Sequence, residues 1–391
     1  MLQQIIEATG LEVQTCAALL GVSPRLFGEW IAGKRPLPYS MANVLSAVVG
    51  VDAGLLLAPR QVKSADVAEI TPAIWFKFRG DQLVDADREC VFLVRRLGYF
   101  LNELEEVTGK RSVAWKPIFE AIRKNIDTQA PPRIQGRQAA KLFRESTGLA
   151  QGATGVGDVL RGNLRALGVL VIETPLPESK LEGCSFYAGP HQWERPCVFA
   201  NLHHSTWFRR NVVLMHEVGH AIFDAESAGA SLDFVDPREA DELAEHRAQA
   251  FSQEVLAPKS VLRHVAQANG LKWDSMSAQD LAIFVAKTQV EKKTLLEAAV
   301  EAELVTQEEA ERYIDLDISP YLPDLTSHAL STAEYISKIG KESQEWVGKR
   351  GTTIPSRNMR LSVGYVNLVL SACREGEISP SKAAEMLLID E

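Results

Sequence analysis

The run NVVLMHEVGHAIF, residues 211–223, places two histidines and a glutamate inside an otherwise almost wholly apolar segment. A helix over these residues puts His216 and His220 one turn apart on the same side, with Glu217 on an adjoining face. Apolar residues surround the helix, so most of it must be buried. Because an unpaired imidazole or carboxylate is costly to bury, these three side chains need a partner.

A divalent metal ion would be that partner. The HExxH pattern on a helix is typical of two zinc ligands, His216 and His220, with a general base, Glu217, between them. Manganese or iron could replace zinc in such a site. A catalytic zinc also takes a third protein ligand and keeps one open position.

The helix expected over 237–256 offers the third ligand. Its candidates are Glu239, Asp241, Glu242, Glu245 and His246. Glu245 is favoured, because Ala248 and Ser252 on its helix are small and would let the two helices approach closely. Glu242 is the alternative.

The run RRNVVLMHEVGHAIFD and the later pattern ExxAxxFxxxxLxP resemble the ImmA/IrrE metallopeptidases. The second pattern consists of Glu245, Ala248, Phe251, Leu256 and Pro258. The resemblance extends over about 137–260, with Arg209 just upstream of the first helix. It implies a zincin-like domain in which His216, His220 and Glu245 hold zinc and Glu217 is the base. It assigns no residue to stabilise an oxyanion, for which His203, His204 and His246 are candidates.

Three short strands are expected at VLVIETP, CSFYAG and PCVFAN, from their β-branched and aromatic residues and flanking Gly and Pro. Strand PCVFAN, or its hairpin partner, could hold an extended substrate by edge pairing. Cys184 and Cys197 lie on these strands. Either thiolate could cap the open metal position, but a role as small buried residues is favoured.

Residues 12–32 have the spacing of a helix-turn-helix, with a turn at Gly21 and a cap at Ser23-Pro24. Residues 1–57 resemble the Cro/repressor-like domains, whose second helix enters the DNA major groove. The candidate DNA-binding residues are Arg25, Glu29, Lys34 and Arg35. The pattern departs from that family at Val13 and Ile31, where glutamine and an acidic residue are common.

The overall charge limits how such a domain could bind DNA. The chain has a formal charge of −9, and residues 1–60 hold as many acidic as basic side chains. Because phosphate neutralisation supplies most non-specific affinity, a monomer should bind DNA weakly and would need to form a homodimer. The alternative is a helical module that docks another protein.

The cysteines and the hydropathy indicate the compartment. The 5 cysteines are widely spread and form no CxxC pair, so we expect reduced thiols rather than disulfides. No segment has the length of a membrane span, and the first residues lack a signal-peptide pattern. We therefore expect a cytoplasmic protein with no membrane partner.

These observations predict a mostly α-helical α+β fold. Its expected parts are a helix-turn-helix bundle at 1–58, a helical connector at 59–130, a zincin-like peptidase domain with a small sheet at 131–260, and a helical region at 261–391 that completes or extends that domain.

Three functions remain open. The leading hypothesis is a regulator that combines DNA binding with a zinc endopeptidase cleaving a protein partner, such as a repressor. The second is a transcriptional regulator or antitoxin whose peptidase-like domain senses a signal or binds a toxin or another partner, with little turnover. The third is a peptidase whose N-terminal helices only recruit substrate.

Overall fold

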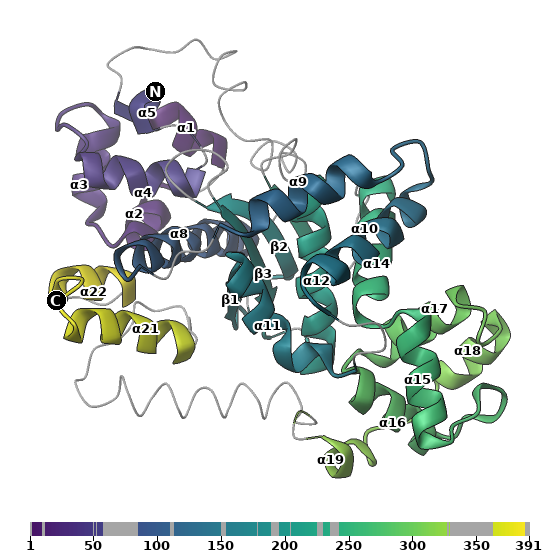
Figure 1. Cartoon of the computed structure of the whole chain (residues 1–391). Helices are drawn as coiled ribbons and strands as arrows, with labels where there is room; N and C mark the ends of the chain where they lie inside the picture. The colour runs from purple at the N-terminus through teal and green to yellow at the C-terminus, as the bar shows by residue number, and fades with distance from the viewer. Residues whose placement is uncertain are drawn as a thin grey trace.

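The computed structural model describes residues 2–9, 12–49, 51, 53–57, 85–109, 113–149, 154–177, 179–188, 195–203, 205–224, 230–234, 242–326, 328 and 363–387. Within them the protein is mostly helical with one small sheet, so the predicted α+β class is confirmed (Figure 1). None of the helices in these ranges is long and apolar enough to cross a bilayer.

The N-terminal lobe consists of short helices. They are α1 (Leu2–Thr9), α2 (Val13–Leu20), α3 (Pro24–Ile31), α4 (Tyr39–Val49) and α5 (Ala53–Leu57). Gly21 ends α2 with a φ of 70°, a left-handed conformation that glycine adopts without strain. Ser23 Oγ then accepts a hydrogen bond from the backbone N–H of Leu26, and Pro24 opens α3. The turn and cap predicted from the sequence therefore form.

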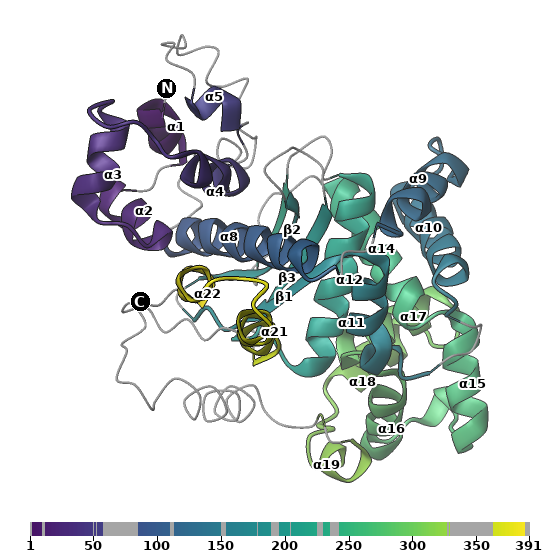
Figure 2. The ribbon, with the colours of Figure 1, turned by 60° about the vertical axis from the view of Figure 1, so that its left-hand side comes forward.

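The long helix α8 (Asp85–Val107) joins this lobe to the sheet. Residues 90–100 of α8 are buried throughout. One side of α8 packs on α4 and α2, and another lies across the sheet (Figure 2). As a result, the N-terminal helices, α8 and one face of the sheet share a single hydrophobic core.

The sheet has the strand order β1-β3-β2-β4. Its strands are β1 (Leu170–Thr174), β2 (Leu181–Ala188), β3 (Arg195–Asn201) and β4 (Ala230–Phe234). β1 runs parallel to β3, whereas the other neighbours are antiparallel. The three predicted strands are present, and β4 was missed. The predicted substrate pairing on β3 or β2 is wrong, because both strands already have neighbours on two sides.

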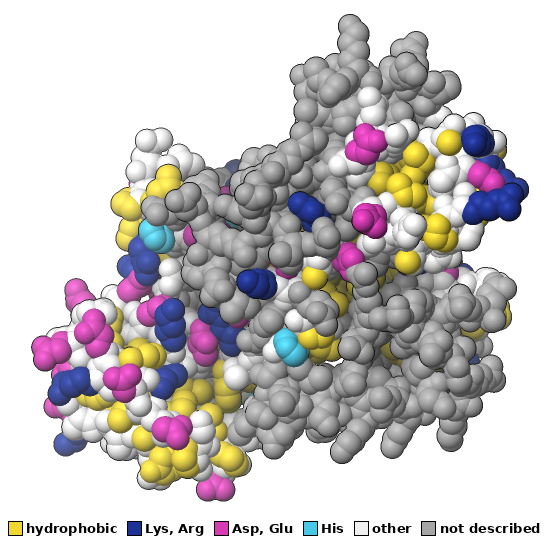
Figure 3. Space-filling model, turned by 180° about the vertical axis from the view of Figure 1, so that it is seen from behind, with side chains coloured by type: hydrophobic (Ala, Val, Ile, Leu, Met, Phe, Trp, Pro, Cys, Tyr) yellow, Lys and Arg dark blue, Asp and Glu magenta, His cyan; other side chains and the backbone are white. Residues whose placement is uncertain are grey.

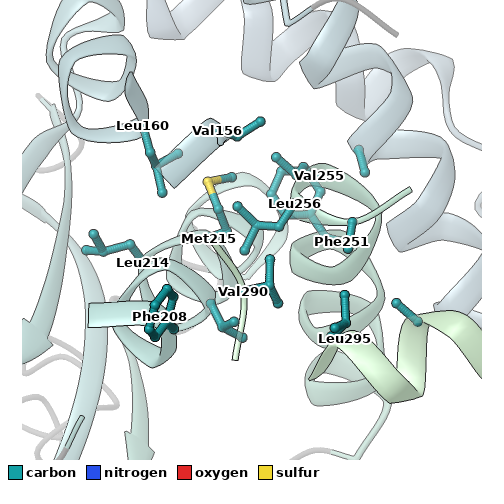
Figure 4. Packing of buried hydrophobic residues seen from close by; sticks show 14 of the residues in the cluster. Val156, Leu160, Phe208, Leu214, Met215, Phe251, Val255, Leu256, Val290 and Leu295 are labelled. Carbon is teal, nitrogen blue, oxygen red and sulfur yellow. The ribbon is translucent and has the colours of Figure 1, made fainter. Parts of the chain in front are cut away.

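Helix α12 (Trp207–Phe223) covers the face of the sheet opposite α8 and packs on α14 (Glu242–Leu256). α10 (Pro132–Ser146) packs on α14, α9 (Trp115–Asn125) contacts α10 and α12, and α11 (Val156–Leu167) contacts α12 and β1 (Figure 1). Apolar side chains of α12 and α14, among them Leu214, Met215, Phe251 and Val255, interlock in this second core (Figure 4).

The C-terminal helices divide between the two cores. The first group consists of α15 (Lys259–Asn269), a 3-10 turn at Trp273–Ser275, α16 (Ala278–Thr288), α17 (Lys292–Glu301), α18 (Gln307–Ile314) and α19 (Leu322–Leu325). This group extends the core of α12 and α14. The second group, α21 (Val363–Arg374) and α22 (Pro380–Leu387), joins the core of α8 and the N-terminal lobe.

Candidate metal centre

Helix α12 presents the two histidines toward a common point. Thr206 caps this helix by accepting a hydrogen bond from the backbone N–H of Arg209 at 3.2 Å. The Nε2 atoms of His216 and His220 lie 3.0 Å apart. Both rings therefore offer the same nitrogen to one location.

Helix α14 brings a carboxylate to that location. Glu245 Oε2 lies 3.1 Å from His216 Nε2, and Glu245 Oε1 lies 3.4 Å from His220 Nε2. Ligand atoms of the three residues all fall within 4.8 Å of one another. Two imidazoles and a carboxylate are the donor set of many catalytic zinc sites, so these residues fit a divalent ion.

Close packing of the helices explains why the three residues meet. A Cβ added to Gly219 of α12 would lie 3.1 Å from Ala248 Cα, and one added to Gly136 of α10 would lie 2.2 Å from Arg247 O. Glycine at both positions lets α14 fit between α12 and α10. The close approach expected from Ala248 is confirmed.

The electrostatics of the three residues are strongly coupled. Burial alone would lower the pKa of His220. Hydrogen bonds to Asp224 and Glu245 raise it by more than burial lowers it, and the net pKa is about 10. Burial raises the pKa of Glu245, yet its hydrogen bonds to both histidines outweigh this and leave the pKa far below its usual range. Without an ion, a proton on His220 therefore offsets the charge of Glu245.

Glu217 lies on the side of α12 that faces the sheet and is 0% exposed. A Cβ at Gly183 of β2 would lie 2.9 Å from Glu217 Oε1 and 2.6 Å from Val213 Cγ1. Only glycine at position 183 leaves room for this carboxylate. The pairing of β2 with β4 also shifts register between Leu181 and Gly183. Sequence reasoning missed Gly183, although a glycine within a strand often marks such a close approach.

Arg209 ties the start of α12 to its surroundings. Its guanidinium donates to both carboxylate oxygens of Glu182, at 2.7 and 2.6 Å, and to Glu291 at 2.7 Å. Burial lowers the pKa of Arg209, but these two carboxylates raise it above its usual range. Arg209 thus fixes α12 against β2 and the start of α17.

The other candidate residues lie elsewhere. His203 and His246 are exposed and outside the cluster. Cys184 and Cys197 are buried in the core on the α8 side of the sheet, where desolvation raises their thiol pKa values. The favoured role as small core residues is confirmed for both cysteines.

Some alternatives lie outside what the structure describes. His204, Glu239 and Asp241 fall outside the described residues. Glu242 begins α14, but its side chain is also outside the description. Among the described residues, the cluster takes its carboxylate from Glu245.

The candidate DNA-binding residues lie on the surface of the N-terminal lobe. Arg25, Lys34 and Arg35 are exposed. Arg25 Nε lies 3.2 Å from Glu29 Oε1, and Arg35 Nη1 lies 3.9 Å from Glu29 Oε2. Figure 3 shows basic side chains, with acidic ones among them, at the outer end of this lobe. Tyr39 of α4 is also 67% exposed on this lobe.

In this arrangement α12 carries two histidines and a glutamate against a small sheet and α14 adds a carboxylate, as is typical of metallopeptidases with an HExxH helix. Residues 164–276 match the family model Peptidase_M78, described as the IrrE N-terminal-like domain. The match contains the whole cluster, covers less than a third of the chain and supports the resemblance to the ImmA/IrrE peptidases. No curated protein and no solved structure matches the chain.

Proposed function

We propose that this protein is a regulatory zinc endopeptidase that cleaves a protein partner. The observation that carries the proposal is the convergence of His216, His220 and Glu245 on one point. Glu217 follows His216 on the same helix, and its charge raises the pKa of His220. His216, His220 and Glu245 would hold the ion, which is zinc or, as an alternative, manganese. When bound, the ion supplies Lewis acidity and lowers the pKa of water toward neutrality.

Glu217 would perform the proton transfers. A carboxylate next to the nucleophilic water takes its proton and passes it to the leaving amine. The Glu217 side chain is 0% exposed and lies against Gly183 of β2, so packing sets its position before substrate binds. Such positioning avoids reorganisation during the reaction.

The exposed fractions indicate where substrate would enter. The side chain of His220 is 1% exposed, whereas those of His216 and Glu245 are 13% and 29% exposed. The cluster therefore opens on the side of His216 and Glu245. Among the described strands, β4 is the outermost strand beyond β2 and could offer an edge to an extended peptide.

Substitution of Glu217 tests the proposal. Glu217→Gln should keep one metal ion per chain, because Glu217 is not in the ligand cluster, while cleavage falls about 10²- to 10⁴-fold. Metal would be counted on purified protein. Regulatory proteins encoded beside its gene would serve as test substrates, and their cleavage would be measured by mass spectrometry. Absence of stoichiometric metal in the parent, or unchanged cleavage by the variant, rejects the proposal.

A second candidate function is a DNA-binding regulator or antitoxin in which the peptidase-like domain binds a partner, such as a toxin, with little turnover. It is favoured by α2 and α3, which meet at a capped turn and expose Arg25. Binding would involve Arg25, Glu29, Lys34 and Arg35, in a homodimer that adds phosphate contacts. Under this function Arg25→Ala weakens promoter binding, whereas Glu217→Gln leaves regulation unchanged.

A further inference from the structure

The second ring nitrogen of His220 points away from the metal cluster and meets a carboxylate. His220 Nδ1 lies 2.9 Å from Asp224 Oδ2. Asp224 is the C-cap of α12, and its backbone N–H donates to the carbonyl oxygen of His220 at 2.7 Å. One helical turn thus joins the two residues through both backbone and side chain. Because Asp224 accepts a hydrogen bond from Nδ1–H, Nε2 is the nitrogen that loses its proton when a metal binds.

Asp224 is held in turn by two other helices. Arg247 of α14 donates through Nη2 to Asp224 Oδ1 and through Nη1 to Gln135 Oε1 of α10, the latter at 3.2 Å. Gln135 Nε2 donates to the carbonyl oxygens of Thr128 and Ala130, at 3.1 and 2.8 Å. These two bonds fix the amide of Gln135 so that its oxygen faces Arg247.

The ion pair between Asp224 and Arg247 is largely buried. The side chains of Asp224 and Arg247 are 18% and 23% exposed, so water screens their ion pair only in part. Gly136, next to Gln135, brings α10 against the backbone of Arg247. Among the described residues, His216 Nδ1 has no comparable carboxylate, so this arrangement serves one of the two histidines.

We propose that Asp224, held by Arg247 and Gln135, is a positioning residue that sets the tautomer and ring orientation of His220 for metal binding. The inference rests on the metal site proposed above. It adds that affinity for the ion depends on three residues outside the ligand set, which connect α10, α14 and α12.

Metal affinity tests this role directly. Asp224→Ala should weaken binding of Zn²⁺ and Co²⁺ about 10- to 100-fold and alter the visible absorption spectrum of the Co²⁺-loaded protein. Asp224→Asn keeps an acceptor oxygen for Nδ1 and should recover part of the affinity. Arg247→Met should weaken binding less than Asp224→Ala. The double variant should bind no more weakly than Asp224→Ala alone, because Arg247 acts through Asp224.

Glu301→Ala provides the matched control. Glu301 of α17 is also a partly buried carboxylate, and it pairs with Arg133 and Arg137 of α10, the latter at 2.6 Å. This control should change thermal stability without changing metal affinity. If Asp224→Ala binds Zn²⁺ and Co²⁺ like the parent, the positioning role is overturned and the metal site stands. If the parent binds neither ion, both proposals fail.

Discussion

The metal cluster and the surface of the N-terminal lobe both contain carboxylates beside cationic groups, but the two settings differ. Glu245 meets His216 and His220 between packed helices, and His220 is 1% exposed. In the Arg25–Glu29 pair, by contrast, the arginine side chain is 90% exposed. Water screens the second pair, so its charges contribute little to holding the residues in place. Packing therefore specifies the cluster closely and the surface pair only loosely.

Among the substitutions that test this contrast, removal of a metal ligand should have the largest effect. Glu245→Ala deletes the donor from α14 and leaves two histidines on one helix, so metal affinity should fall by more than the factor of about 100 expected for a supporting residue. Competition with a chelator of known affinity measures the loss. Retention of affinity within tenfold of the parent would show that another residue supplies the third ligand.

Metal binding should strengthen as pH rises. An ion must displace the proton of His220, whose pKa is raised from 6.5 to about 10, whereas Glu245 is already ionised. Because one proton is displaced for each ion bound, metal affinity should grow by about tenfold per pH unit between pH 6.5 and about pH 10. Titrations at several pH values measure the slope, and a flat profile contradicts the coupling.

The metal-free protein should show the opposite trend in stability. The raised folded-state pKa means that the contribution of His220 is fully present below pH 6.5 and is lost as pH rises toward about 10. Chemical denaturation of metal-free protein across this range measures it. His220→Gln should remove most of the pH dependence in that window.

Alanine substitution at two glycines compares a tightly packed helix contact with an open helix surface. A Cβ at Gly136 would clash with the backbone oxygen of Arg247, whereas one at Gly162 of α11 meets nothing within 4 Å. Gly136→Ala should lower the free energy of unfolding by about 1 to 3 kcal/mol and weaken metal binding. Gly162→Ala should raise it by up to about 1 kcal/mol, because alanine favours a helix. Equal effects would contradict the packing argument.

The smallest effect is expected at the surface pair. Arg25→Ala should change the free energy of unfolding by less than about 1 kcal/mol, since an exposed ion pair contributes little. If the lobe binds DNA, the same change should reduce the slope of log affinity against log salt by about one. Fluorescence anisotropy with promoter DNA at several salt concentrations measures the slope. An unchanged slope would remove Arg25 from the interface.

Local features of this protein could be read from short stretches of sequence. The spacing of His216 and His220 follows from the helical repeat, and Gly21, Ser23 and Pro24 mark a turn and cap that depend on neighbouring residues alone. The strands around Val171, Phe186 and Val198 also follow from local composition. Each of these features depends on interactions within a few residues.

The pairing of distant segments could not be read in this way. Strand β4 has a short and weak pattern, and its position beside β2 makes the expected edge unavailable to substrate on β2 or β3. Gly183 is significant only because Glu217 lies against it. The contacts of Asp224, Arg247 and Gln135 likewise join three helices that the sequence separates.

The amino-acid sequence by itself determined the α+β class, the helix that carries His216, Glu217 and His220, and the short N-terminal helices, because periodicity and capping act over one or two turns. Only the tertiary structure decided that the Glu245 carboxylate reaches both imidazoles, that Gly183 makes room for Glu217, and that Arg247 and Gln135 hold the aspartate that contacts His220. These arrangements depend on how closely whole helices and strands approach, which packing across the core sets.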